Sequence, residues 1–170
     1  MKAIGAVAFV LVMGWASSLG AQTVVNLTST LDARIDSATA TTNYGANVTL
    51  SAVNTMSFLL QFDLSSIPAG STITAATLSL KASNGTADTY EIYEVLRVWV
   101  EGTGVAGSGV TYNSFDGAVA WQTAGCLGVL DRGTTVLGSV GPTTTTVIPE
   151  VWPLNAAAVP RLQNWLNGPP

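Results

Sequence analysis

The stretch SFLLQFDLSSIPAGSTITAATLSLKAS, residues 57–83, contains two runs in which apolar and polar side chains alternate. Such a period of two is typical of half-buried β-strands. Pro68 and Gly70 lie between the runs and predict a turn that connects two strands. The side chains that this pattern directs to the core are Phe58, Leu60, Phe62, Leu64, Ala76, Leu78, Leu80 and Ala82.

The longest further strand candidate is TYEIYEVLRVWVE, residues 89–101. Its even positions, from Tyr90 to Val100, are apolar except for Glu94, and we expect this face to point to the core. The odd positions combine aromatic rings, carboxylates and Arg97, which is a mixture typical of a surface that binds a ligand.

The segment NVTLSAV, residues 47–53, is a shorter strand candidate, and NAAAVPRLQNW, residues 155–165, is the one helix candidate. We expect Asn155 to cap this short helix at its N-terminus. About eight short strands separated by turn signals favour an all-β fold, namely an antiparallel β-sandwich, jelly-roll-like, with one short C-terminal helix. The apolar helix face is predicted to comprise Val159, Leu162 and Trp165.

Residues 1–21 have the composition of a secretory signal peptide, with Lys2 as a basic start, an apolar run and small residues at the end. The run is short for a membrane span, and no cysteine marks a lipoprotein. We expect cleavage between Gly20 and Gln22, which leaves residues 22–170 as one secreted domain, extracellular or at the cell surface. A retained anchor is the alternative.

Composition excludes several classes of function. The chain has no histidine, which rules out Ser-His-Asp and Cys-His catalysis and imidazole-bound zinc. Without Lys2 it carries five basic and ten acidic side chains, so nucleic acid, which needs clustered basic residues, is not an expected partner. The single cysteine, Cys126, can form no internal disulfide and is expected to be buried.

Four segments together match one known pattern. They are DARIDSATATTNYGANVTLSAV (32–53), the stretch 57–83, VLRVWVEGTGVAGSGVTYNSFDGAVAWQTAGCLG (95–128) and LNAAAVPRLQNWLNG (154–168). In this order they resemble the DNRLRE domain, which is similar to carbohydrate-binding module family 96, and the resemblance extends from about Thr23 to Gly168. It implies a secreted β-sandwich that accompanies polysaccharide-degrading and cell-surface proteins.

The chain departs from this family pattern in three places. The family usually has tryptophan at the position of Tyr112 and glycine at the position of Cys126. Its pattern also continues with a further strand, whereas this chain stops at Pro170. We therefore expect the domain to lack its last strand, which would leave an exposed sheet edge or a gap in the core.

Sugar recognition uses aromatic faces that stack on a pyranose ring and polar groups that bond its hydroxyls. Guanidinium also suits an acidic sugar, because it bonds a carboxylate through two donors. The alternatives are that Trp99 is a core residue, that Asn113 forms a turn, and that Trp121 closes the end of the sandwich. The expected carbohydrate-binding residues are Tyr93, Arg97, Trp99, Tyr112, Asn113 and Trp121, with Tyr112 and Asn113 the expected outward pair.

The tripeptide Asn43-Tyr44-Gly45 is expected to form a turn with Gly45 at positive φ and Tyr44 as a plug, and a ligand role is the alternative. No cofactor is expected. Nor does any EF-hand spacing occur, so that a structural calcium ion would depend on carboxylates that nothing in the spacing brings together. Its available oxygen donors are Asp32, Asp36 and Asp63.

Catalysis is not expected. Glu91 and Glu101 share one face of the predicted strand but lie roughly 33 Å apart in an extended chain. Glycoside hydrolysis requires carboxyl groups within about 5–10 Å. The sequence therefore predicts a non-catalytic module that binds a polysaccharide, within a larger extracellular protein, and the resemblance implies an anionic, alginate-like glycan. A structural or adhesive spacer without a ligand of its own is the alternative.

Overall fold

The computed structural model describes the backbone of residues 4–13 and the residues 22–53, 55–82, 85, 87–143 and 147–168 in full. It is an antiparallel β-sandwich with one short C-terminal helix, and the all-β prediction is confirmed. The elements are β1 (Ile4–Met13), β2 (Thr23–Asp36), the 3-10 turn η1 (Ser37–Thr39), β3 (Met56–Phe62), β4 (Ile73–Ala82), β5 (Tyr90–Ile92), β6 (Gly138–Val140), β7 (Ile148–Pro153) and α1 (Ala158–Asn167).

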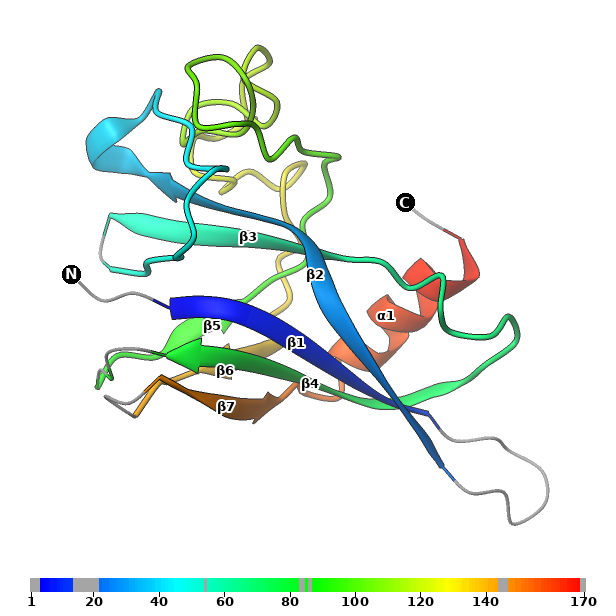
Figure 1. The fold of residues 1–170 in the computed structure, drawn as a ribbon. Coiled ribbons are helices and arrows are strands. Elements are labelled where there is room, and N and C mark those ends of the chain that lie inside the picture. The colour runs from blue at the N-terminus through cyan, green and yellow to red at the C-terminus, as the bar shows by residue number, and fades with distance from the viewer. Residues whose placement is uncertain are drawn as a thin grey trace.

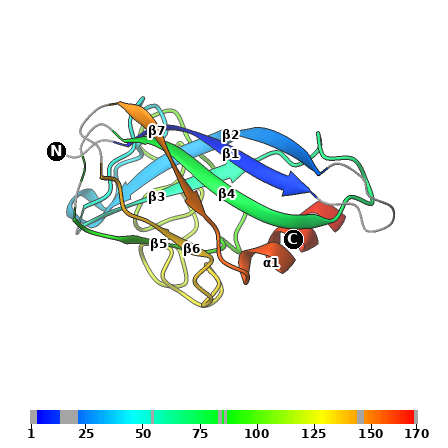
Figure 2. The same cartoon turned by 90° about the horizontal axis from the view of Figure 1, so that it is seen from below.

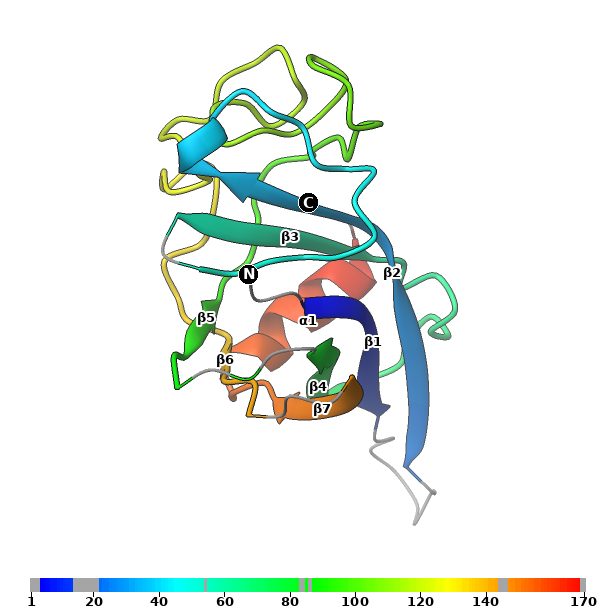
Figure 3. The same ribbon diagram turned by 60° about the vertical axis from the view of Figure 1, so that its left-hand side comes forward.

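Five strands form the larger sheet in the order β3-β2-β1-β4-β7, and every neighbouring pair is antiparallel. The second layer contains the two-stranded sheet β5–β6 and the helix α1 (Figure 2). Figure 3 shows the larger sheet curving around α1. The connection between β5 and β6 is irregular and gathers at one end of the sandwich, beside η1 (Figure 1).

The main core lies between the larger sheet and the second layer. Leu78 and Leu80 of β4 are buried there, and Phe58 and Phe62 of β3 pack against the same cluster. The even positions of residues 57–83 therefore face the core, as the alternation predicts. Because these side chains come from two strands joined by one turn, the segment 57–83 alone supplies much of the core-facing side of the larger sheet.

A second cluster of buried side chains occupies the end of the sandwich where the loops gather. It contains Ile35 of β2, Leu59 of β3 and the indoles of Trp99 and Trp121. Strand β2 contributes to both clusters, since Leu27 near its start is buried in the main core. Strand β3 likewise has side chains of both faces covered, which a simple alternating pattern does not reveal.

The prediction of one long strand at residues 89–101 is wrong. Only β5 forms regular strand, and the buried face changes side after Glu94. Val98 on the even face is 83 % exposed, whereas Trp99 on the odd face is 5 % exposed. The segment leaves the main core and enters the second cluster, so neither set of alternate positions faces one core throughout. Residues 47–53 also form no regular strand, and Val48 is exposed.

Helix α1 begins at Ala158, three residues after the predicted cap. Asn155 instead stabilises the preceding turn, where its Oδ1 accepts a hydrogen bond from the backbone of Ala157 at 2.9 Å. Pro160 lies in the first turn, where its missing N–H costs no intrahelical bond. No helix in the described ranges is long and apolar enough to span a lipid bilayer. The predicted apolar face packs on the main core through Val159, Leu162 and Trp165.

Residues 4–13, which fall inside the predicted signal peptide, form the central strand β1 of the larger sheet. The predicted cleavage region at Gly20 lies outside the described residues. Cleavage therefore stays a prediction.

Candidate functional site

All six residues predicted to bind carbohydrate lie in the connection between β5 and β6, residues 93–137. This connection forms the loops at one end of the sandwich, shown in yellow-green in Figure 1. Loops held by a rigid sheet are common positions for binding residues. The position of each predicted side chain within these loops decides what it can contact.

The two tryptophans are interior residues. Trp99 is 5 % exposed and Trp121 is 4 % exposed, and both belong to the second cluster. The indole N–H of Trp121 donates to the Thr111 carbonyl at 3.0 Å, and its ring meets Phe115 in an edge contact with centroids 5.7 Å apart. Neither indole offers a free face on which a sugar ring could stack, so we describe the site without them.

Asn43 joins two loops at this end of the molecule and is only 3 % exposed. Its Nδ2 donates to the carbonyls of Glu101 at 2.7 Å and Val110 at 2.8 Å. Its Oδ1 accepts from the backbone N–H of Gly104 at 2.8 Å and, at longer distance, from Gly45 and Ser108. One amide side chain thus fixes the position of the 102–109 loop relative to the end of β2.

The prediction of a positive φ at Gly45 is wrong. Glycine is needed at this position for a different reason. A Cβ atom at this position would lie 2.1 Å from the Glu101 carbonyl oxygen. Glycine therefore permits close approach of two backbones here. Tyr44 beside it stacks under the Arg34 guanidinium, 3.9 Å from the ring centroid, and its hydroxyl contacts Thr39.

Four half-buried side chains, which we call the arginine strip, combine two guanidinium groups with two aromatic rings. They are Tyr93, Arg97, Phe115 and Arg132. The guanidinium carbon of Arg132 lies 4.0 Å from the Tyr93 ring centroid, and that of Arg97 lies 5.3 Å from the Phe115 centroid. An antiparallel bridge between Val95 and Arg132 joins the segment that carries Tyr93 and Arg97 to the segment that carries Arg132.

Asp131 fixes the inner end of this strip. Its side chain is fully buried and accepts the Nε–H of Arg97 at 3.3 Å. Burial opposes the charged form of Asp131, but backbone N–H donors from Gln122 and Thr123 outweigh it and lower the pKa. Arg97 lowers this pKa further, so Asp131 is a carboxylate at neutral pH and holds the Arg97 side chain beside Phe115.

Tyr93 at the other end of the strip is neutral at physiological pH. Its hydroxyl donates to the Glu91 carboxylate, and this bond is the main cause that raises the pKa of Tyr93. The strip therefore presents two guanidinium groups, of which Arg97 is paired with the Asp131 carboxylate, and Glu91 is a second negative neighbour at its edge. Such an arrangement can bond carboxylate or sulfate groups on a ligand.

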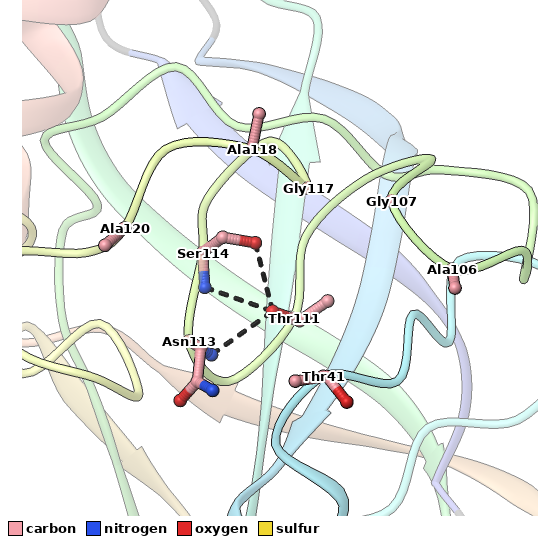
Figure 4. A pocket seen from close by; sticks show the side chains of 9 residues that line it. All are labelled: Thr41, Ala106, Gly107, Thr111, Asn113, Ser114, Gly117, Ala118 and Ala120. Atoms are coloured by element: carbon pink, nitrogen blue, oxygen red, sulfur yellow. Dashed lines mark hydrogen bonds between the residues drawn. The ribbon is translucent and has the colours of Figure 1, made fainter.

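A shallow pocket of about 370 Å³ lies among the same loops (Figure 4). The Thr111 hydroxyl at its floor accepts the backbone N–H groups of Asn113 at 3.2 Å and Ser114 at 3.0 Å. The pocket has no aromatic wall and is bordered by small side chains, glycine backbone and the exposed Asn113, which suits bonding to hydroxyl groups. Its lining residues are Thr41, Ala106, Gly107, Thr111, Asn113, Ser114, Gly117, Ala118 and Ala120.

Tyr112 belongs to neither the arginine strip nor the pocket lining and packs against the second cluster. Its half-buried ring packs against the backbone of Gly125, where a Cβ atom would lie 2.7 Å from Tyr112 Cε2. Cys126, which follows, is buried as predicted and has a positive φ of 61°. Burial raises the pKa of its thiol to about 12. The predicted outward pair of Tyr112 and Asn113 is therefore split between a packed ring and an exposed amide.

The acidic residues considered for calcium do not gather. Asp36 accepts a hydrogen bond from the backbone N–H of Ala38. Asp63 accepts hydrogen bonds from the backbone N–H and the hydroxyl of Ser65. Asp32 lies near Glu101 instead, and burial together with that carboxylate raises the pKa of Asp32. Within the described part of the chain, no three acidic or cysteine side chains lie close enough to hold a metal ion.

Of the predicted residues, Tyr93 and Arg97 each form a contact between a guanidinium and a ring, and their partners, Arg132 and Phe115, were not predicted for the site. Phe115 follows Asn113 closely in sequence, and its proximity to a predicted residue was the available signal. Arg132 had no local signal, because its contact with Tyr93 arises from a bridge between segments about forty residues apart.

Comparison with known protein families gives one match, carbohydrate-binding module family 96, over residues 23–114. No curated protein and no solved structure matches the chain. The matched region includes β2, β3, β4 and the first half of the loop end, with Tyr93, Arg97 and Asn113. Because it covers more than half of the 170 residues, the chain belongs to carbohydrate-binding module family 96, as the sequence phrases predict.

Proposed function

We propose that the chain is a secreted, non-catalytic module that binds an anionic polysaccharide through the arginine strip. The observation that carries this proposal is the pairing of Arg97 and Arg132 with the rings of Phe115 and Tyr93. A guanidinium that already rests on a ring has lost part of its side-chain freedom, so less entropy is lost when it bonds a carboxylate.

The mode of binding follows from what covers the rings. Guanidinium groups lie over Tyr93 and Phe115, so stacking on sugar rings would contribute little and charge-assisted hydrogen bonds would dominate. The pocket beside Asn113 would take uncharged hydroxyl groups. Because the formal net charge is −4, long-range attraction to a polyanion is not expected. Binding should therefore be local, weak and sensitive to salt.

The test measures the affinity of wild-type and variant chains for a polyuronate by isothermal titration calorimetry. Arg132→Gln removes the guanidinium that has no ion pair among the described side chains, and we expect about five- to tenfold weaker binding. Arg132→Lys keeps the charge but loses the planar donor pair, so its affinity for the polyuronate should lie between those of wild type and Arg132→Gln.

The matched control is Lys81→Gln, which removes the same charge from an exposed position on β4. It should change affinity by less than about twofold, because a distant exposed charge is screened. Equal loss in Arg132→Gln and Lys81→Gln would indicate non-specific attraction and contradict the assignment of the strip. Absence of binding to every polysaccharide tested would remove the proposed function.

Secretion is proposed on the composition of residues 1–21. Expression in a host that exports proteins, followed by N-terminal sequencing of the exported form, tests it. We expect the mature chain to begin at Ala21 or Gln22. An exported chain that still begins at Met1, or a chain that stays in the cytoplasm, would contradict secretion by a cleaved leader.

One observation favours the alternative of a structural or adhesive spacer. The four rings considered from sequence are all buried or half-buried, so no flat aromatic platform is exposed among them. A spacer predicts that Arg132→Gln changes the stability of the fold and that no polysaccharide is retained. The calorimetric series above distinguishes the two, since only the binding module loses affinity selectively at Arg132.

A further inference from the structure

The position of β1 in the larger sheet has a consequence for how this domain is completed. Residues 4–13 lie between β2 and β4 and run antiparallel to both (Figure 1). The same residues form the apolar part of the predicted signal peptide. A segment expected to be removed thus occupies the centre of the sheet rather than its edge.

The ladder of backbone pairs shows how much depends on this strand. Residues 23–28 of β2 pair with β1, whereas β3 pairs only with the second half of β2, from Ser29 onward. On the other side, β1 pairs with β4 from Ile73 to Ala82, whereas β7 pairs with β4 only from Thr77 onward. Among the described strands, β1 is the only connection between the β3–β2 pair and the β4–β7 pair.

Without an occupant in this position, the five-stranded sheet would divide into two separate strand pairs. Two-stranded ribbons are marginally stable in water, and the main core draws buried side chains from both halves, Leu27 from β2 and Leu78 from β4. The vacant slot would also leave two rows of unpaired backbone groups facing each other. Both effects favour filling the slot with another extended strand.

The register defines what such a strand must look like. Phe9 stands opposite Leu27 of β2 and Leu78 of β4, which are 5 % exposed each. Leu11 stands opposite Ala76, which is also buried. The positions between them are different, since Val10 stands opposite Asn26 and Thr77. An occupant therefore needs apolar residues at alternate positions and can be polar at the others.

We propose that the slot between β2 and β4 is a strand-acceptor site for an extended polypeptide segment with apolar residues at alternate positions. In the whole chain, residues 4–13 occupy it. When the backbone between this segment and β2 is cut, the segment stays bound in the slot. Another strand supplied in trans can then replace it. Main-chain hydrogen bonds to two neighbours give the affinity, and the alternate apolar positions give the selectivity.

The test uses the full chain with a site-specific protease sequence inserted between Met13 and Gln22. The protein is folded intact and then cut, and size-exclusion chromatography with mass spectrometry follows the released segment. We expect the N-terminal piece to stay with the domain. A fluorescent peptide of residues 4–13, made soluble by terminal lysines, should then exchange into the slot.

Two peptide variants provide the matched pair. Phe9→Thr with Leu11→Thr changes the positions opposite the core, and should bind roughly tenfold or more weakly because that apolar surface stays in water. Val10→Thr with Val12→Thr makes the same chemical change at the other positions and should bind nearly as well as the parent, since threonine suits strands.

Three outcomes contradict the proposal. In the first, the cut segment dissociates and the remaining chain keeps its β-sheet signal and melting temperature, which would mean that β2 and β4 close the gap themselves. In the second, the cut chain unfolds and added peptide does not restore it. Equal binding of the two peptide variants would likewise contradict the register on which the selectivity depends.

Discussion

Asn43 and Asp131 are the two buried polar residues that organise the loop end, and both act mainly on backbone groups. Asn43 bonds the carbonyls of Glu101 and Val110, and Asp131 bonds the N–H groups of Gln122 and Thr123. Irregular loops cannot satisfy these groups through a ladder, so side chains replace it. At the residue scale, the site therefore depends on hydrogen bonds more than on aromatic surface.

Replacing Asn43 with alanine should lower the free energy of unfolding by about 2–3 kcal/mol, because several backbone partners lose their bonds in a buried place. Urea unfolding followed by tryptophan fluorescence measures this. The control is Asn47→Ala at an exposed position of the same segment, with an expected change below about 0.5 kcal/mol. Equal effects for the two variants would mean that the Asn43 bonds contribute nothing specific.

Asp131 predicts a pH dependence of stability. Its pKa is lowered in the folded state, so its charged form stabilises the fold fully above the unfolded value of about 3.9, and this contribution is lost as the pH falls through the folded value. Asp131→Asn should be less stable than wild type at pH 7, by about 1–3 kcal/mol, and the gap should narrow toward pH 2.

The comparison of wild type and Asp131→Asn is needed because Asp63 and Asp116 also have lowered pKa values. Both acids are present in each protein, so their contribution cancels in the difference. A stability gap that stays constant from pH 7 to pH 2 would show that the charge of Asp131 does not stabilise the fold.

At the scale of elements, strands β3 and β4 were predictable because each faces the main core along its length. Their alternation survives in the structure, with Phe58, Leu78 and Leu80 in one cluster. Residues 93–101 were not predictable in the same way, because they pass from one cluster to another after Glu94 and bury Trp99 instead of Val98. A periodic pattern indicates an apolar face but not which of two cores receives it.

Helix α1 contributes to the main core as its pattern predicts, and Leu162 is its most buried large side chain at 3 % exposure. Leu162→Ala should lower the free energy of unfolding by about 2–5 kcal/mol through lost contacts and a cavity. Chemical denaturation measures the change, with exposed Asn164→Ala on the same helix as the control. A decrease in the free energy of unfolding below about 1 kcal/mol for Leu162→Ala would mean that the helix contributes little to the stability of the main core.

At the scale of the whole molecule, the family was predictable, whereas the contacts among the predicted site residues were not. The phrase at 57–83 lies inside the region that matches carbohydrate-binding module family 96. The predicted Tyr93 and Arg97 reach the surface as half-buried side chains, but their arrangement depends on Arg132 and Phe115. These contacts join segments distant in sequence, which no local pattern encodes.

The central claim is that this module recognises the negative charge of a polysaccharide. The most direct measurement compares binding of the full chain to a polyuronate and to the same polymer after its carboxyl groups are reduced to alcohols, by calorimetry at low salt. We predict binding to the parent polymer and about tenfold or weaker affinity for the reduced one, because the guanidinium groups of Arg97 and Arg132 lose their charged partners. Equal affinity for both polymers, or retention of neither, would contradict the account.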